Sequence, residues 1–184
     1  MSGRTDADIH HVGIFGRRLS GKTTLTIHFL ATSYAREKRM AVVLDPKMGE
    51  HNWGNHCYVT NNREKWLAKW QHPQCRNCNV VWEETSTTLK RDRSFADVFT
   101  AKAGAHGHRL IITGHTAASL LPEMRDQITE IFVFRQSLAE AEKWADQFAD
   151  PRVRELAMSL DYGAREFLHV RMGCEPRKLR LVLP

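Results

Sequence analysis

The segment GRRLSGKTT, residues 16–24, has the residue types and the spacing of a loop that binds phosphate. It matches the pattern G-x-x-x-x-G-K-[ST], after an apolar run and before a helical pattern. The two glycines leave room for backbone N–H groups to curl around phosphate oxygens. Lys22 supplies a compact positive charge for the β- and γ-phosphates, and the hydroxyl of Thr23 is a ligand for Mg²⁺. The residues that we expect to line this ATP site are Gly16, Arg17, Arg18, Leu19, Ser20, Gly21, Lys22, Thr23 and Thr24.

A pair of carboxylates ends a second apolar run, NVVWEE at 79–84. A phosphate-binding loop needs an acidic partner at the end of another buried strand. We expect Glu83 to hold Mg²⁺ through a water molecule, as a Walker B acid does, and Glu84 to polarise the attacking water as general base. The alternative interpretation is that both glutamates are solvated at a strand end. The apolar strand directly before them favours the catalytic interpretation.

These residues need elements that position them, and runs of strand length alternate with helical patterns along the chain. The expected strands are 10–15, 40–45, 56–60, 79–84, 109–114, 129–136, 164–172 and 177–184, with helices from the loop to 36 and at 62–70, 94–103, 138–149 and 151–160, and a turn-like stretch at 115–127. Such alternation predicts βαβ units. We therefore expect one α/β domain over residues 1–184 with a short N-terminal tail at 1–9. Its expected fold is a three-layer P-loop NTPase of the ASCE or RecA-like kind, with a mostly parallel central sheet and a late β-hairpin at the C-terminus.

The order of these segments bears on the class of P-loop protein. An expected strand, VVLD, lies between the glycine loop and Glu83, and a second acid follows Glu83. This layout is typical of motor-type P-loop ATPases. Small nucleoside and nucleotide kinases usually carry an arginine-rich lid late in the chain, and no clear lid is present, so a kinase is the less favoured alternative.

The chain has 184 residues, 42% of them hydrophobic and 26% charged, as in a globular protein with its own core. Its net charge of +6 suits a polyanionic partner but does not require one. No apolar run approaches the ~20 residues that cross a bilayer, and the N-terminus lacks the layout of a signal peptide. We therefore expect no membrane-spanning segment and a location in the cytosol or inside a host cell.

Four cysteines are too few for a disulfide framework in a chain of this size. Cys75 and Cys78 form a CxxC pair, which raises zinc or redox chemistry. No second CxxC or HxxxH completes a zinc site, although His56, Cys57 and His72 are near in sequence. Ordinary reduced thiols are the favoured interpretation, and a metal at this pair stays open.

Four stretches, GIFGRRLSGKTTL, VVLDPK, VVWEE and IITGHTAASLLPEMRDQITEIFVFRQS, resemble the FtsK–HerA superfamily of DNA-pumping ATPases. The resemblance covers residues 10–137 and is greatest to the small genome-packaging ATPases of membrane-containing double-stranded DNA viruses and bacteriophages. It implies a Mg-dependent ATPase that couples hydrolysis to translocation of double-stranded DNA and packages a viral genome into a preformed capsid. The alternative is an assembly or export ATPase of the same superfamily, which moves protein or single-stranded DNA.

The resemblance also implies partners. It implies a homo-oligomeric ring, expected to be a hexamer, with ATP between neighbouring subunits and with capsid vertex or portal proteins docked at the packaging vertex of the virion in the host cytoplasm. A neighbour would supply an arginine to the γ-phosphate. Arg125 is the preferred candidate by motif position, ahead of Arg91 and Arg93. The alternative for Arg125 is a surface ion pair with Asp126 or Glu123.

One position departs from the superfamily pattern. Members commonly carry glutamine at the end of the strand after the Walker B acids, where it senses the γ-phosphate, and the equivalent residue here is His115. Because the charge of histidine varies near neutral pH, this sensor predicts a pH-sensitive ATPase. Arg17 and Arg18 are not needed by a cradle made of backbone. They favour a loop at a subunit interface, facing a neighbour's acidic surface or the nucleotide.

The segment TLKRDRS at 88–94 follows the carboxylate pair and is a candidate pore loop. Its Lys90, Arg91 and Arg93 are the candidates for contacts to DNA phosphates, which would be sequence-independent and salt-sensitive. A solvated helix start is an equal alternative. KAGAHGHR at 102–109 is a second candidate pore segment.

The aromatic residues indicate core packing rather than base stacking. Trp66 and Trp70 share one helical face, and Trp82 lies within an expected strand. Trp53, in a loop that contains glycine, is the exception, and we expect it either to cover the adenine or to rest on a neighbouring subunit.

Overall fold

The computed structural model describes residues 11–85 and 106–182. Its strands are β1 (His11–Phe15), β2 (Ala41–Leu44), β3 (Cys57–Thr60), β4 (Asn79–Trp82), β5 (Arg109–Gly114), β6 (Ile128–Phe134), β7 (Glu166–Arg171) and β8 (Arg177–Arg180). Its helices are α1 (Lys22–Glu37), α2 (Arg63–Trp70), α4 (Pro122–Asp126), α5 (Leu138–Phe148), α6 (Arg152–Met158) and the short 3₁₀ helix η5 (Ala117–Ser119). The predicted strands and helices are confirmed with shifted boundaries, apart from the helix expected at 94–103, which lies outside the described residues.

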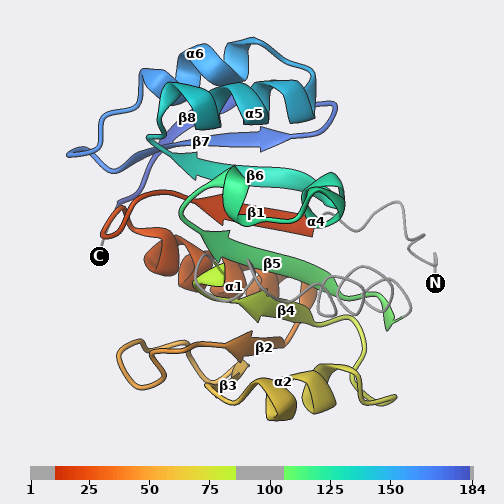
Figure 1. The fold of residues 1–184 in the computed structure, drawn as a ribbon. Helices are drawn as coiled ribbons and strands as arrows, with labels where there is room; N and C mark the ends of the chain where they lie inside the picture. Colours follow the sequence, from red (N-terminus) through yellow and green to blue (C-terminus); the bar gives the residue numbers. More distant parts are fainter. Residues whose placement is uncertain (1–10, 86–105, 183–184) are drawn as a thin grey trace.

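These strands form one sheet in the order β3-β2-β4-β5-β1-β6-β7-β8 (Figure 1). The pairs among β1 to β6 are all parallel. β7 runs antiparallel to β6, and β8 runs antiparallel to β7. The mostly parallel sheet and the late hairpin predicted from the sequence are therefore confirmed. In space β5 separates β1 from β4, whereas in sequence β2 and β3 lie between them.

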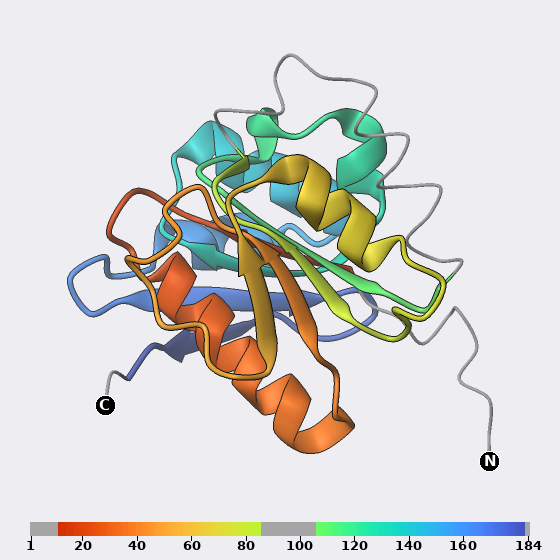
Figure 2. The same cartoon turned by 90° about the horizontal axis from the view of Figure 1, so that it is seen from below.

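Helices cover both faces of the sheet, so the predicted three layers are confirmed (Figure 2). On one face, Leu25 of α1 packs in a core that includes Val43. On the opposite face, Trp66 of α2 and Trp144 of α5 belong to a core that includes Val42. Neighbouring residues of one strand thus enter opposite cores, because successive strand side chains point to opposite faces.

The tryptophans expected in the core are buried, and Trp66, Trp70 and Trp82 are at most 2% exposed. Trp53 corrects the expectation made for it, since it is only 3% exposed and packs in the core beneath α1. Its indole N–H donates a 2.9 Å hydrogen bond to Oδ2 of Asp45. The fully buried carboxylate of Asp45 needs such a donor. Trp53 is therefore not placed to cover the adenine or to rest on a neighbour.

The stretch 115–127, expected to be turn-like, contains η5 and α4. Pro122 occupies the first turn of α4, where its missing N–H costs no hydrogen bond. This connection carries the chain from the carboxyl end of β5 to the amino end of β6. None of the helices in the described part of the chain has the length and apolar character needed to span a membrane.

Candidate nucleotide site

The loop between β1 and α1 has the backbone conformation of an anion cradle. Leu19 and Gly21 have positive φ angles of 64° and 105°, in the region that favours glycine. A Cβ at Gly16 would lie 2.7 Å from the Cβ of Phe134, so the chain can pass there only without a side chain. α1 begins directly after Gly21, and no side chain caps its first N–H groups. These N–H groups and the positive end of the helix dipole are available to an anion.

Lys22 is buried beneath this loop and is only 5% exposed. Its Nζ donates a 3.2 Å hydrogen bond to the carbonyl oxygen of Arg17 and lies 3.9 Å from Oε1 of Glu84. Burial lowers the pKa of Lys22, against the opposing effect of Glu84 and Glu83. A buried ammonium group with such incomplete compensation favours a further anionic partner.

Glu83 is buried at the end of β4, with 2% exposure, and both of its oxygens accept hydrogen bonds from hydroxyls. The hydroxyl of Thr23 donates to Oε1 at 2.6 Å, and the hydroxyl of Thr113 donates to Oε2 at 2.8 Å. Burial raises the pKa of Glu83, while the two hydroxyl donors act in the opposite direction. β4 therefore delivers a carboxylate directly to the first turn of α1.

Glu84 has a left-handed backbone, with φ 56°. Its side chain is 26% exposed, and its Oε2 lies 3.3 Å from Nε2 of His115. Nδ1 of His115 in turn lies 3.2 Å from the carbonyl oxygen of Gly16. Both ring nitrogens of His115 thus lie near an oxygen that can accept a hydrogen bond. The two nitrogens can donate at the same time only when each carries a proton. The structure therefore brings the predicted sensor, the predicted base and the glycine loop together.

Thr113 is a site residue that the sequence analysis missed. Its hydroxyl donates to Glu83 and accepts a 2.9 Å hydrogen bond from the backbone N–H of Glu84. Its carbonyl oxygen accepts a 2.7 Å hydrogen bond from the hydroxyl of Thr85. The available signal was a threonine near the end of an otherwise apolar strand, RLIITG. Its place between the two acids depends on β5 lying beside β4.

The tip of the glycine loop is exposed, and the hydroxyl of Tyr162 donates a 2.8 Å hydrogen bond to the carbonyl oxygen of Arg18. Of the residues predicted to line the site, Gly16, Ser20 and Lys22 are buried, Gly21 and Thr23 are half-buried, and Arg17, Arg18, Leu19 and Thr24 are exposed. A cavity of ≈ 320 Å³ opens beside the tip, lined by Arg17, Arg18, His115, Thr116, Arg135, Gln136, Ser137 and Glu140. Its arginines make it suited to anions.

The helix α4, which carries Arg125, lies at the end of the sheet opposite the glycine loop (Figure 1). This helix lies just before β6 in the chain, and Ile128 of β6 pairs with His11, the first residue of β1. The glycine loop instead follows the last residue of β1. The structure therefore does not bring Arg125 to the loop of its own chain, and a role at a neighbour's nucleotide stays a prediction. The other basic candidates, Lys90, Arg91 and Arg93, lie outside the described residues.

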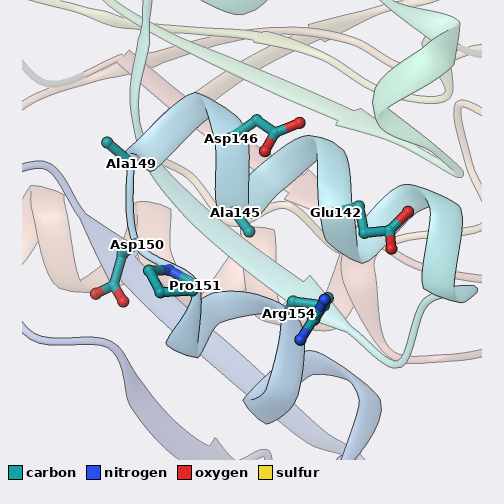
Figure 3. Close-up of a pocket in the computed structure, with 7 residues that line it drawn as sticks. All are labelled: Glu142, Ala145, Asp146, Ala149, Asp150, Pro151 and Arg154. Carbon is teal, nitrogen blue, oxygen red and sulfur yellow. The ribbon is translucent and has the colours of Figure 1, made fainter.

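A second cavity, of ≈ 400 Å³, is separate from this site. It lies between α5 and α6, where it is lined by Glu142 and Asp146 of the first helix and Arg154 of the second (Figure 3). None of its lining residues belongs to the predicted nucleotide site.

The glycine loop lies between a buried strand and a helix. The carboxylates follow a parallel strand that is separated from the first by one other strand. This combination defines the P-loop NTPase fold. Solved structures bear this out. The genome-packaging NTPase B204 of Sulfolobus turreted icosahedral virus 2, in complex with sulfate, matches with a TM-score of 0.75 at 16% identity, over 95% of this chain and 98% of that chain. VirB4 of Thermoanaerobacter pseudethanolicus matches with a TM-score of 0.70 at 8% identity, over 100% and 92% of the two chains.

The pCW3 conjugation coupling protein TcpA matches with a TM-score of 0.60 at 12% identity, over 97% of this chain and 62% of that chain. No family model and no curated protein matches the chain. At these identities the likeness is one of fold, and it agrees with the P-loop NTPase fold expected from the sequence. B204 has also been solved with AMPPCP and with ATP-γS.

Proposed function

We propose that this chain is an ATP-driven translocase of double-stranded DNA that packages a viral genome into a preformed capsid. The observation that carries the proposal is the convergence of Lys22, Glu83 and Glu84 at the carboxyl ends of β1 and β4. The likeness of the fold to a genome-packaging NTPase supports the choice among P-loop enzymes.

Within this proposal the hydrogen-bonded pair of Thr23 and Glu83 would hold Mg²⁺, because a hydroxyl and a carboxylate are the hard oxygen donors that this ion prefers. When bound, Mg²⁺ neutralises charge on the β- and γ-phosphates. The remaining loop residues bind the phosphates through backbone N–H groups, and Lys22 adds a positive charge for the γ-phosphate.

Glu84 is the general base of the proposed reaction. It is more exposed than Glu83, and its Oε1 lies 3.9 Å from Nζ of Lys22 in the structure. A γ-phosphate would compete with Glu84 for Lys22, which releases the carboxylate to accept a proton from water. His115 contacts both Glu84 and Gly16, so it can report the state of the γ-phosphate position to the base.

The proposal includes a homo-oligomeric ring, a hexamer, in which Arg125 of one subunit acts on the nucleotide of the next. The position of Arg125, away from its own loop, supports action between subunits. In this proposal the basic residues Lys90, Arg91 and Arg93 contact the phosphates of DNA. The ring would act with capsid vertex or portal proteins at the packaging vertex in the host cytoplasm.

A second candidate is an assembly or export ATPase, which the likeness to VirB4 and to a conjugation coupling protein favours. Steady-state release of phosphate from ATP, measured over a salt series with double-stranded DNA, single-stranded DNA or no DNA, separates the two. Stimulation by double-stranded DNA that fades as salt rises is expected, because phosphate contacts release counterions. Hydrolysis without stimulation at low salt contradicts the translocase. Transfer of phosphate to a nucleotide acceptor would instead indicate a kinase.

A further inference from the structure

Cys75 and Cys78 lie in contact in the connection between α2 and β4, with their Sγ atoms 3.3 Å apart. Backbone hydrogen bonds hold both residues. The N–H of Cys75 donates to the carbonyl oxygen of His72 at 2.8 Å, which closes a turn, and the N–H of Arg109 donates to the carbonyl oxygen of Cys78 at 2.9 Å. Cys78 is therefore fixed to the start of β5, and Cys75 is folded back onto it.

The two thiols differ in their surroundings. Cys75 is half-buried, whereas Cys78 is buried. Burial, reinforced by the hydrogen bond with Cys75, raises the pKa of Cys78 to about 12. Because the thiolate is the nucleophile in thiol chemistry, the more exposed Cys75 is the thiol that attacks first, and Cys78 is held in reserve behind it.

Both thiols line a cavity of ≈ 920 Å³ beside the edge strand β3, and a reagent can reach the pair through this cavity. Lys65, Lys69 and Arg76 also line this cavity, as does His72. No acidic residue is among the lining residues that the structure describes. The charge of the cavity therefore favours a small anionic reagent over a neutral one.

We propose that Cys75 and Cys78 form a dithiol site that reduces small anionic disulfides and closes an intramolecular Cys75–Cys78 disulfide. In the first step the Cys75 thiolate attacks one sulfur of the disulfide, an S–S bond forms to Cys75, and one thiolate leaves and takes up a proton. In the second step Cys78 loses its proton to water and attacks Sγ of Cys75, which releases the second thiolate. One disulfide is reduced to two thiols while the protein dithiol is oxidised by two electrons.

The first step also prepares the second. The hydrogen bond and the charge of Cys75 both contribute to the raised pKa of Cys78, and both disappear once Cys75 is in a mixed disulfide. Burial, the largest cause of the raised pKa, persists, so the pKa of Cys78 falls but stays above its ordinary value, and the resolving thiolate becomes more abundant. This site is independent of the nucleotide site, so its test does not depend on ATP hydrolysis.

The chain contains matched controls for this site. Cys57 lines the same cavity from β3, and burial raises its pKa to about 11, whereas Cys174 is exposed beyond β7. The double variant Cys57→Ser/Cys174→Ser leaves only the proposed pair. Its reaction with oxidised glutathione, followed by intact mass and by counting the thiols that remain open to alkylation, is the central experiment. We expect loss of both thiols and of two hydrogen atoms, with no glutathione retained.

Adding Cys78→Ser to this background is expected to trap glutathione on Cys75, and adding Cys75→Ser is expected to leave Cys78 unreacted. Lys69→Gln should slow the reaction with oxidised glutathione by a factor of about 3 to 10 and leave the rate with neutral bis(2-hydroxyethyl) disulfide unchanged. Circular dichroism checks that each variant is folded. Stable glutathione adducts on the intact pair, modification of Cys78 without Cys75, or two thiols that persist at high oxidant overturn the proposal.

Discussion

The hydroxyl of Thr23 donates a 2.6 Å hydrogen bond to Oε1 of Glu83, although the two residues are 60 positions apart in the chain. The contact joins the first turn of α1 to the end of β4 across β5, the strand that lies between β1 and β4. It places a hydroxyl and a buried carboxylate where they can share one divalent cation.

Thr23→Val removes this hydroxyl while keeping the shape of the side chain. We expect ATP hydrolysis to fall by about 10²-fold or more, with a rise in the Mg²⁺ concentration needed for half-maximal activity. Thr32→Val, at a half-buried position further along α1, is the matched control and should stay near the wild-type rate. Equal losses in the two variants would argue against a special role for Thr23.

Glu84→Gln removes the proposed general base without changing the size of the side chain. We expect hydrolysis to drop by about 10²- to 10⁴-fold while binding of a fluorescent ATP analogue persists. Glu50→Gln changes an exposed glutamate in the loop after β2 and should be neutral. Full activity of Glu84→Gln would remove Glu84 as the base.

Glu83 makes the folded state sensitive to pH in the absence of ligands. Its pKa is raised by burial above the usual value of 4.5, so the protonated form favours folding and this contribution is lost as pH rises through the folded pKa. Glu83→Gln should therefore raise the melting temperature of the nucleotide-free protein at neutral pH by about 2–8 °C. The gain should shrink below pH 4.5, and Glu142→Gln, at an exposed position, should show neither effect.

Thr113→Val tests the residue that joins the two acids. The substitution leaves Oε2 of Glu83 without its 2.8 Å donor and the N–H of Glu84 without its 2.9 Å acceptor. We expect the free energy of unfolding to fall by about 1–3 kcal/mol, measured by urea denaturation, together with a lower kcat. Unchanged stability with full activity would show that these contacts are dispensable.

Arg125 can be tested between subunits. Arg125→Ala should lower kcat by about 10²- to 10³-fold, and Arg154→Ala, on the exposed face of α6, should not. Mixing Arg125→Ala subunits with Lys22→Ala subunits should restore activity, because one kind supplies an intact loop and the other supplies the arginine. No recovery in rings shown to be mixed would contradict action in trans.

Much of the site could be predicted because its signals are local. The glycines, Lys22 and Thr23 follow a strand and precede a helix within one short segment, and Glu83 directly follows the buried residues of β4. The helical spacing of Trp66 and Trp70 is enough to place both in the core. This spacing can be read from the local sequence, without knowing which segments pack against the helix.

Other features depend on contacts between segments that are distant in the chain, and the local spacing of residue types does not predict such contacts. Only the tertiary structure places β5 between β1 and β4, which sets Thr113 between Glu83 and Glu84 and brings His115 to Gly16. Trp53 was misjudged for the same reason, since its partner Asp45 becomes a buried carboxylate only after the sheet has assembled. The sequence by itself determined which groups are candidates for the chemistry and after which strands they lie. The tertiary structure decided which of these groups come into contact. The order of the strands sets these contacts, and that order depends on pairing between segments distant in sequence and on the packing of helices against both faces of the sheet.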